Sequence, residues 1–160
     1  MKLRYFEELK PDALQDYYST DIDFEGRQIQ LDINFESNTI AESRLLIVNN
    51  ILEKLPEFVD KLKHFIQEDF KEGNDVQEFL DFHIDEMDEE LESLLLTTDK
   101  KLNKDEQLLS VVSLRRIGFY PEEDDNFTVA DFGLDREISQ YVLVVNTTED
   151  QELNYITMES

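Results

Sequence analysis

The sequence predicts an α+β fold with an N-terminal β-hairpin, a central block of about four helices and a C-terminal antiparallel β-meander. The helices are expected to pack on one face of the sheet. Two observations predict this arrangement. Apolar residues alternate with polar ones near the N-terminus, recur every three to four residues through the middle of the chain, and gather in short runs beyond residue 114. The chain has 160 residues, 40% of them hydrophobic, and no linker rich in Gly, Pro or Ser, so residues 1–160 are expected to form a single domain.

Residues 21–32, DIDFEGRQIQLD, resemble the calcium loop of an EF-hand, because carboxylates stand at the first, third, fifth and last positions and Gly26 at the sixth. The residues around this stretch alternate with a period of two, which favours two strands joined by a turn at Glu25 and Gly26. The expected cross-strand pairs are Phe24 with Arg27, Ile22 with Ile29, Thr20 with Leu31 and Tyr18 with Ile33. In this register the carboxylates, Asp32 included, lie on the solvent-exposed face and share no centre, so we expect no calcium site.

The first two helices are predicted from their start and stop signals. Thr39 and Glu42 have the spacing of a capping box, which predicts a helix that begins there. Pro56 suits the first turn of a second helix, and Gly73 suits its end. The apolar stripe expected for the first helix comprises Ile40, Ser43, Leu46, Ile47, Asn50, Ile51 and Leu55, and that of the second comprises Phe58, Leu62, Phe65, Ile66 and Phe70.

A third helix is expected to begin at Asn74 or Asp75 and to run through Met87 to Leu91. A fourth is expected after Asn103, because Glu106 follows three residues later in a second capping-box pattern. Four strands are then predicted over RRIGFYP, NFTVADF, QYVLVVNTT and ELNYITM. The run YVLVV is apolar at every position, which favours a central strand covered on both faces, whereas the alternating hairpin is expected nearer an edge.

The charge balance excludes several classes of partner. Acidic residues number 39 and basic residues 15, giving a formal net charge of −24, so we expect no direct binding to nucleic acid and no binding to anionic membrane surfaces. No apolar run approaches the length of a signal peptide or a membrane span, and a cytoplasmic location is expected. The absence of cysteine removes disulfides, thiolate metal sites and cysteine nucleophiles.

Four stretches carry a resemblance to a known family: LQDYYSTDIDFEGRQIQLDINFE, VQEFLDFHIDEMDEEL, RRIGFYPEEDDNFTVADFGLD and YVLVVNTTEDQELNYITMES. Together, and in this order, they resemble the bacterial domain of unknown function 2004 (DUF2004). The resemblance spans essentially the whole chain. It lies in the general residue pattern of these stretches and in their order, and it includes no catalytic or ligand-binding motif. It implies a small bacterial cytoplasmic protein of unassigned activity, and it implies no catalytic residue.

The one candidate for acid–base or metal chemistry is His83. On a continuous helix His83, Glu86 and Glu90 would stand at i, i+3 and i+7, near one face. His83 also falls in the apolar stripe, and Leu80 occupies the position where a di-iron helix would need a glutamate. We therefore interpret His83 as a core residue satisfied by a hydrogen bond, and expect no catalytic residue, no metal site and no cofactor.

The acidic residues of the third predicted helix suggest a surface that binds a partner. Ten carboxylates and no Lys or Arg lie between Glu72 and Glu92, with Asp81, Asp85 and Glu89 stacked at i, i+4 and i+8. A second acidic run, EEDD, follows the first predicted strand of the meander. The candidate partner-binding residues are Asp81, Asp85, Glu86, Glu89, Glu90, Glu122, Glu123, Asp124 and Asp125. A solvated surface with no partner is the alternative explanation.

Two functions from different classes follow from these patterns. The first is a small, acidic, non-catalytic protein-binding module that meets a basic protein, as immunity or antitoxin-like proteins do. The second is a small hydrolase or metal-dependent enzyme that uses His83 and scattered carboxylates. A single acidic patch would favour the first function, and a deep cleft holding His83 with carboxylates would favour the second.

Overall fold

The computed structural model describes residues 1–160 and contains six strands and five helices. The strands are β1 (Tyr17–Phe24), β2 (Arg27–Asn34), β3 (Ser113–Phe119), β4 (Thr128–Gly133), β5 (Val142–Thr147) and β6 (Leu153–Glu159). The helices are α1 (Glu42–Glu53), α2 (Leu55–Glu72), α3 (Asp75–Asp85), α4 (Glu89–Leu95) and α5 (Lys104–Ser110). This order confirms the predicted hairpin, helical block and meander of an α+β fold, with one more helix than expected.

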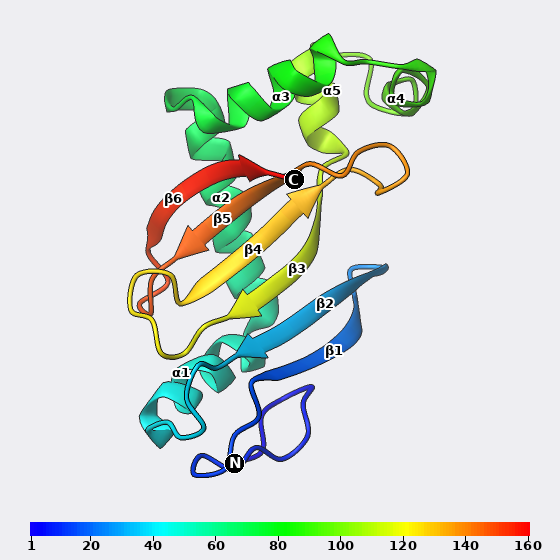
Figure 1. Cartoon of the computed structure of the whole chain (residues 1–160). Helices are drawn as coiled ribbons and strands as arrows, with labels where there is room; N and C mark the ends of the chain where they lie inside the picture. Colours follow the sequence, from blue (N-terminus) through cyan, green and yellow to red (C-terminus); the bar gives the residue numbers. More distant parts are fainter.

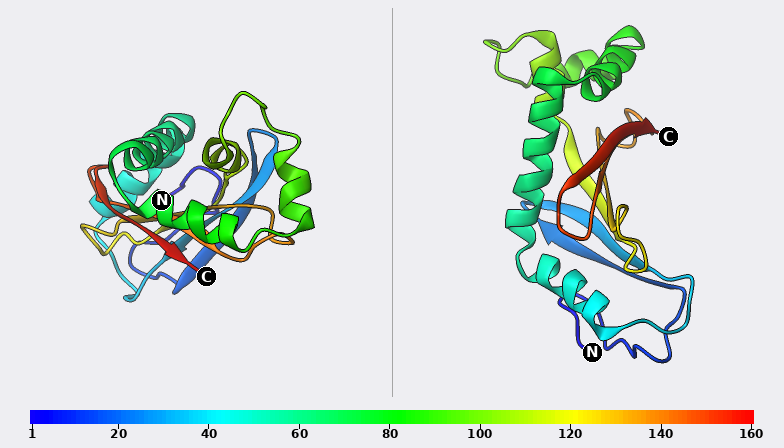
Figure 2. Two further views of the ribbon diagram at one scale, coloured as in Figure 1. Left: turned by 90° about the horizontal axis from the view of Figure 1, so that it is seen from above. Right: turned by 90° about the vertical axis from the view of Figure 1, so that its left-hand side faces the viewer.

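All six strands form one sheet whose order in space follows the order in sequence. Neighbouring strands are antiparallel except β2 and β3, which are parallel because the helical block between them carries the chain back to the same end of the sheet. In Figure 1, α2 runs behind the strands, α1 lies at one end of the sheet, and α3, α4 and α5 lie at the other. Figure 2 shows the same arrangement from two further sides, with no helix across the second face of the sheet.

The predicted hairpin register is confirmed pair by pair, from Phe24 opposite Arg27 to Tyr17 opposite Asn34. The two turn residues have positive φ values, 50° at Glu25 and 82° at Gly26, as in a type I′ turn. Gly adopts this conformation freely, whereas Glu adopts it at a cost. The alternation of the strands, and not an ideal turn sequence, therefore fixes the register.

The predicted start of the first helix is wrong. α1 begins at Glu42, and its N-cap residue, Ala41, makes no side-chain capping bond, so Thr39 does not cap the helix. The Ile40 amide instead donates to the Pro11 carbonyl at 2.9 Å, which holds this segment against the N-terminal residues and outside the helix. The buried residues of α1 are Leu45, Val48, Ile51 and Leu52, whereas Leu46 of the predicted stripe is half exposed.

α2 follows its predicted signals closely. Pro56 lies in its first turn and Gly73 follows its last residue. Because Pro lacks a backbone N–H, this position costs the helix no hydrogen bond. The buried residues of α2 are Leu55, Phe58, Val59, Leu62 and Ile66, so the predicted stripe is largely the face that packs on the core.

The predicted third helix is interrupted, and this is the main difference between the predicted and the observed helices. α3 ends at Asp85, and a new helix begins after Asp88, whose carboxylate accepts a hydrogen bond from the Leu91 amide at 2.9 Å. An N-cap aspartate and three acidic residues in the first turn stabilise a helix start, whereas a continuous helix would stack Asp81, Asp85 and Glu89. The break therefore removes a like-charge stack and adds a cap.

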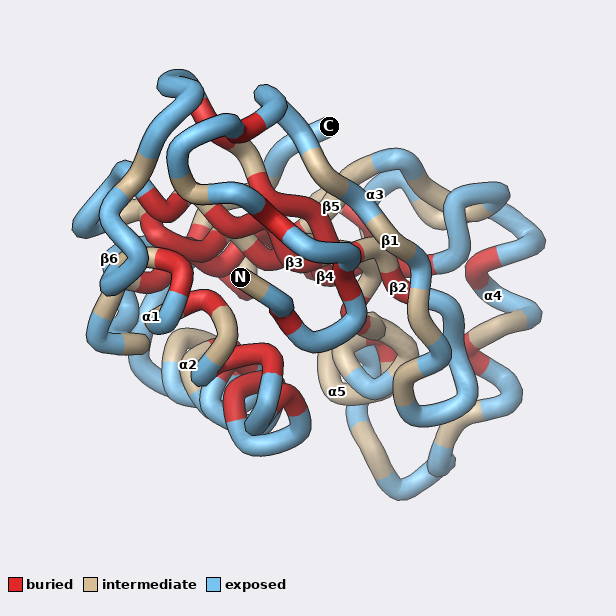
Figure 3. The backbone as a smooth tube through the Cα atoms, turned by 90° about the horizontal axis from the view of Figure 1, so that it is seen from below, coloured by how far each residue is buried: buried red, intermediate tan, exposed pale blue.

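The core lies mainly between α2 and the covered face of the sheet. Its 33 buried residues form one hydrophobic cluster, and Figure 3 shows that buried positions are concentrated on the inner strands. The run predicted to be buried on both faces forms β5, which has Leu143 and Val145 on one face and Val144 on the other, all buried. β5 is an interior strand beside the edge strand β6. None of the five helices combines the length and apolar composition that a bilayer-spanning helix requires.

Candidate functional site

The uncovered face of the sheet contains a buried ion pair that links β2 to β3. Arg116 donates to both carboxylate oxygens of Asp32, from Nε at 2.7 Å and from Nη2 at 2.8 Å. Asp32 is fully buried, so the prediction that its carboxylate lies on the solvent-exposed side is wrong. The reason is Gly118, where a Cβ would approach the Arg116 guanidinium to 2.4 Å. Because Gly118 has no side chain, the guanidinium lies flat on the sheet and covers Asp32.

Neighbouring side chains complete the hydrogen bonding of this pair. Asp32 also accepts from the side chains of Gln30 at 3.1 Å and Asn34 at 2.7 Å. The bidentate bond to Asp32 raises the pKa of Arg116 above its ordinary value, and burial acts in the opposite direction. On the next strand, burial raises the pKa of Asp131, which lies 3.7 Å from Arg116. The pair is thus well satisfied within the sheet.

A β-bulge brings the preceding residue, Arg115, to the same face of the sheet. β3 pairs with β4 through Leu114 opposite Phe132 and then Arg116 opposite Asp131, so Arg115 is the extra residue of the bulge. Residues at a bulge change direction relative to a regular strand. The Arg115 side chain lies over Gly133, whose added Cβ would be 3.3 Å from the Arg115 Cδ. Two consecutive arginines therefore both lie on the uncovered face.

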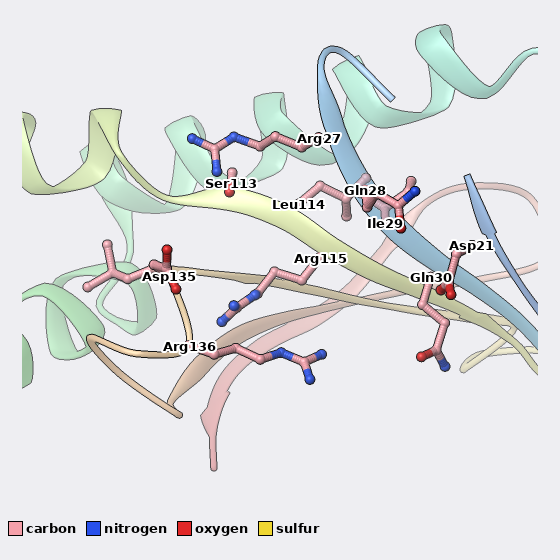
Figure 4. A pocket seen from close by; sticks show the side chains of 11 residues that line it. Asp21, Arg27, Gln28, Ile29, Gln30, Ser113, Leu114, Arg115, Asp135 and Arg136 are labelled. Atoms are coloured by element: carbon pink, nitrogen blue, oxygen red, sulfur yellow. The ribbon is translucent and has the colours of Figure 1, made fainter. Parts of the chain in front are cut away.

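Three arginines line a pocket of about 460 Å³ at this end of the sheet, which we call the arginine pocket. Arg27 comes from the start of β2, Arg115 from β3, and Arg136 from the loop between β4 and β5. Figure 4 shows the side chains of Arg115 and Arg136 extending into the same space. Asp21 and Asp135 line the pocket as well. The pocket is open to solvent and combines charged side chains from four segments of the chain.

His83 attaches α3 to the loop between β4 and β5, residues 134–141. Its Nδ1 lies 2.8 Å from the Phe79 carbonyl, and its Nε2 lies 2.7 Å from the Ser139 hydroxyl. A carbonyl only accepts, so in the neutral ring Nδ1 carries the proton and Nε2 accepts from Ser139. Burial lowers the pKa of His83, while the bond to the Phe79 carbonyl acts against that shift. The predicted burial of His83 is confirmed, and its ring makes two hydrogen bonds rather than the one expected.

The loop of residues 134–141 borders three hollows. The arginine pocket lies at its first residues. A pocket of about 490 Å³ contains His83, Ser139 and Tyr141, and Glu86 and Asp88 also line it. A third hollow, of about 450 Å³, is lined by Glu89, Glu90, Ser93, Asp135, Glu137 and Ile138, and we call it the acidic hollow. The loop therefore separates a pocket rich in guanidinium groups from one rich in carboxylates.

The predicted partner-binding residues fall into two groups that the fold does not bring together. Asp81, Asp85 and Glu86 lie on α3 and just after it, and Glu89 and Glu90 lie on α4. The run of residues 122–125 lies in the loop between β3 and β4, at the opposite end of the molecule (Figure 1). The break between α3 and α4 also means that His83, Glu86 and Glu90 do not share one helix face.

Two residues of the second acidic run, Glu122 and Asp124, form contacts within the protein. Glu122 accepts hydrogen bonds from the backbone amides of Glu36 at 2.6 Å and Ser37 at 2.9 Å. Asp124 forms an ion pair with Arg44 at 3.1 Å. These contacts attach the loop between β3 and β4 to the segment before α1 and to α1 itself, which gives Glu122 and Asp124 a structural role.

Comparison with models of protein families, with curated proteins and with solved structures found no match to this chain. The resemblance to DUF2004 therefore stays a prediction. No group of three or more His, Cys, Asp or Glu side chains is arranged to hold a metal ion.

The three arginines and Ser139 were not among the residues predicted from the sequence. A signal for the arginines was present, because the chain has only six arginines and two are consecutive in a predicted strand. In a regular strand such neighbours point to opposite faces, and only the bulge brings them together. No local pattern links Ser139 to His83, since the two residues are 56 positions apart.

The lowered pKa of His83 predicts how stability depends on pH. The folded protein binds a proton at His83 less readily than the unfolded chain does, so stability should decrease as pH falls through the ordinary histidine range, from about 7.5 to 5.5. Replacing His83 with Gln should remove this part of the slope, as measured by urea unfolding at several pH values. The exposed His64 provides the matched control, and His64→Gln should retain the slope of the parent. Equal slopes in the parent and His83→Gln would contradict the assignment.

Proposed function

We propose that this protein is a non-catalytic binding module whose acidic hollow receives a basic protein. The observation that supports the proposal best is the lining of the hollow, which includes four carboxylates from two elements and no Lys or Arg. Glu89 and Glu90 come from α4, and Asp135 and Glu137 come from the loop of residues 134–141. A Lys or Arg side chain of a partner could contact several of these carboxylates at once. An immunity or antitoxin-like role, in which an acidic protein neutralises a basic one, is consistent with this chemistry.

Exposed carboxylates around the hollow add to its negative electrostatic potential. All ten carboxylates between Glu72 and Glu92 are exposed, and none forms an ion pair within 4.0 Å. With a net charge of −24, the molecule attracts cationic proteins over a distance of about one Debye length, roughly 10 Å at 0.1 M salt. Attraction of this kind acts mainly on the association rate.

The proposal predicts that neutralising the acidic hollow slows binding. The variant Glu89→Gln, Glu90→Gln, Glu137→Gln should reduce the association rate of a basic partner recovered by pull-down from the native host at least fivefold. The dissociation rate should change less, because loss of surface charge acts before contact. Surface plasmon resonance at several salt concentrations provides the measurement, and the rate of the parent should approach that of the variant as salt rises.

The matched control removes the same charge elsewhere. Asp12, Asp60 and Asp150 are exposed, form no ion pair and do not line the hollow, so Asp12→Asn, Asp60→Asn, Asp150→Asn changes the net charge equally outside the hollow. This control should slow association less than the hollow variant. If the two variants slow association equally, only net charge matters and the proposed site is wrong. An acidic partner would also contradict it.

A small hydrolase is the second candidate function, and the bond between Ser139 and His83 is the observation that favours it. The neutral His83 accepts the Ser139 proton at Nε2, which is the arrangement of a serine nucleophile and its base. In such a reaction Ser139 Oγ would attack an ester carbonyl as His83 takes the hydroxyl proton, and the ester C–O bond would break as the leaving alkoxide receives that proton. Water, deprotonated by His83, would then cleave the acyl-serine bond, release the carboxylic acid and restore the Ser139 hydroxyl. The Phe79 carbonyl, which occupies the place of a triad carboxylate, orients the ring but has no full negative charge to stabilise the imidazolium.

A serine-directed probe distinguishes the second function from a structural anchor. If Ser139 is a nucleophile, a fluorophosphonate should add to it and increase the intact mass of the folded protein by one adduct. Ser139→Ala should abolish the adduct, and His83→Gln should slow its formation at least tenfold. Ser93→Ala, which changes a serine on α4, should have no effect. An unmodified parent would mean that the pair only attaches the loop to α3.

A further inference from the structure

The three arginines of the arginine pocket differ from every other arginine in the chain. Arg4, Arg44 and Arg116 each form an ion pair within 4.0 Å, with Glu53, with Asp124 and Glu149, and with Asp32 and Asp131, respectively. Arg27, Arg115 and Arg136 form none. Because carboxylates outnumber basic residues by 39 to 15, an unpaired arginine is unexpected, and three that line one pocket are more so.

The backbone places these side chains together. The bulge turns Arg115 onto the uncovered face, and Gly133 leaves the space that its side chain crosses. Arg136 follows two residues after Leu134, which is buried and fixes the start of the loop. Arg27 is fixed by the hairpin register opposite Phe24. The side chains of Arg115 and Arg136 thus extend into the same space from a strand and a loop, whereas Arg27 lines the pocket from the other side of β3 (Figure 4).

Their proximity is unfavourable without a ligand. Burial lowers the pKa of Arg115, and the neighbouring charges of Arg136 and Arg27 lower it further, while Asp135 and Asp131 act in the opposite direction. Two carboxylates, Asp21 and Asp135, line the pocket against three guanidinium groups. Asp135 also accepts a hydrogen bond from the Glu137 amide at 3.1 Å, which directs one of its oxygens into its own loop. Positive charge therefore remains in excess in the pocket.

We propose that the arginine pocket binds a small molecule bearing a doubly charged oxyanion, either a phosphate ester or a dicarboxylate. Planar guanidinium groups bind such oxygens through paired hydrogen bonds, and two or three of them can surround one anionic group. Gln28, Gln30 and Ser113 line the same pocket and offer hydrogen bonds to the neutral part of the molecule. A volume of about 460 Å³ exceeds what a free phosphate would fill.

The rest of the molecule favours a small ligand over a large polyanion. A net charge of −24 repels nucleic acid and acidic proteins over the whole surface, whereas a compact anion needs only short-range contacts. This inference does not rest on the acidic hollow, because Asp135 is the only residue that lines both the hollow and the arginine pocket.

Isothermal titration calorimetry tests the proposal with two defined probes, pyrophosphate and succinate, at constant ionic strength and without divalent cations. The parent should show saturable binding of at least one probe. Arg115→Gln and, separately, Arg136→Gln should each weaken that binding at least tenfold, because each removes a charge-assisted hydrogen bond to the anion. Arg136 is exposed and lies in a loop, so its variant should fold even if Arg115→Gln does not.

The control and the two probes define the outcomes. Arg4→Gln removes an equal charge from an exposed arginine outside the pocket and should change the affinity less than twofold. Binding of pyrophosphate alone would favour a ligand that bears phosphate, and binding of succinate alone would favour a dicarboxylate. The proposal is overturned if neither probe saturates the parent, or if the pocket variants bind as the parent does.

Discussion

The ion pair between Arg116 and Asp32 joins the two parts of the sheet. It connects the N-terminal hairpin to the C-terminal meander across 84 positions of sequence, at the only parallel pairing in the fold. Removing one partner of such a buried pair typically costs about 3–5 kcal/mol, because the other charge remains buried. The pair also depends on register. Asp32 lies opposite Gly118, and a shift of one residue between β2 and β3 would place it opposite Ile117 or Phe119, whose side chains belong to the covered face, and would break the pair.

The location of the candidate sites follows from this constraint. Once β2 is fixed beside β3, Arg27 at the start of β2 lies near the bulge at Arg115. The loop of residues 134–141 completes the same end of the molecule, and the bond from His83 to Ser139 holds it to α3. This end of the molecule therefore has two differently charged surfaces beside the loop of residues 134–141, the arginine pocket and the acidic hollow. The ion pair between Asp32 and Arg116 and the bond between His83 and Ser139 hold these segments in place. None of these four residues lines the arginine pocket or the acidic hollow.

The sequence predicted the strand register and one of the two capping-box starts, whereas the start expected at Thr39 is absent because the Ile40 amide bonds to Pro11 instead. The hairpin register follows from strict alternation, and the helix start at Asn103 follows from a capping box. The break before Asp88 was missed because the apolar period continues across it, while the competing signal, an N-cap aspartate, stands among many other carboxylates. The burial of Asp32 and the direction of Arg115 depend on contacts between distant strands, which periodicity does not contain.

We propose that the loop of residues 134–141 borders two sites, an anion-binding pocket that includes Arg136 and a cation-binding hollow that includes Glu137. Backbone amide chemical shifts, followed by NMR during separate titrations with pyrophosphate and a tetralysine peptide, test it most directly. Pyrophosphate should move the amides of Ser113, Arg115 and Arg136 most, and tetralysine those of Glu89, Glu90 and Glu137. Shifts spread evenly over the surface, or both probes moving the same amides, would contradict the account.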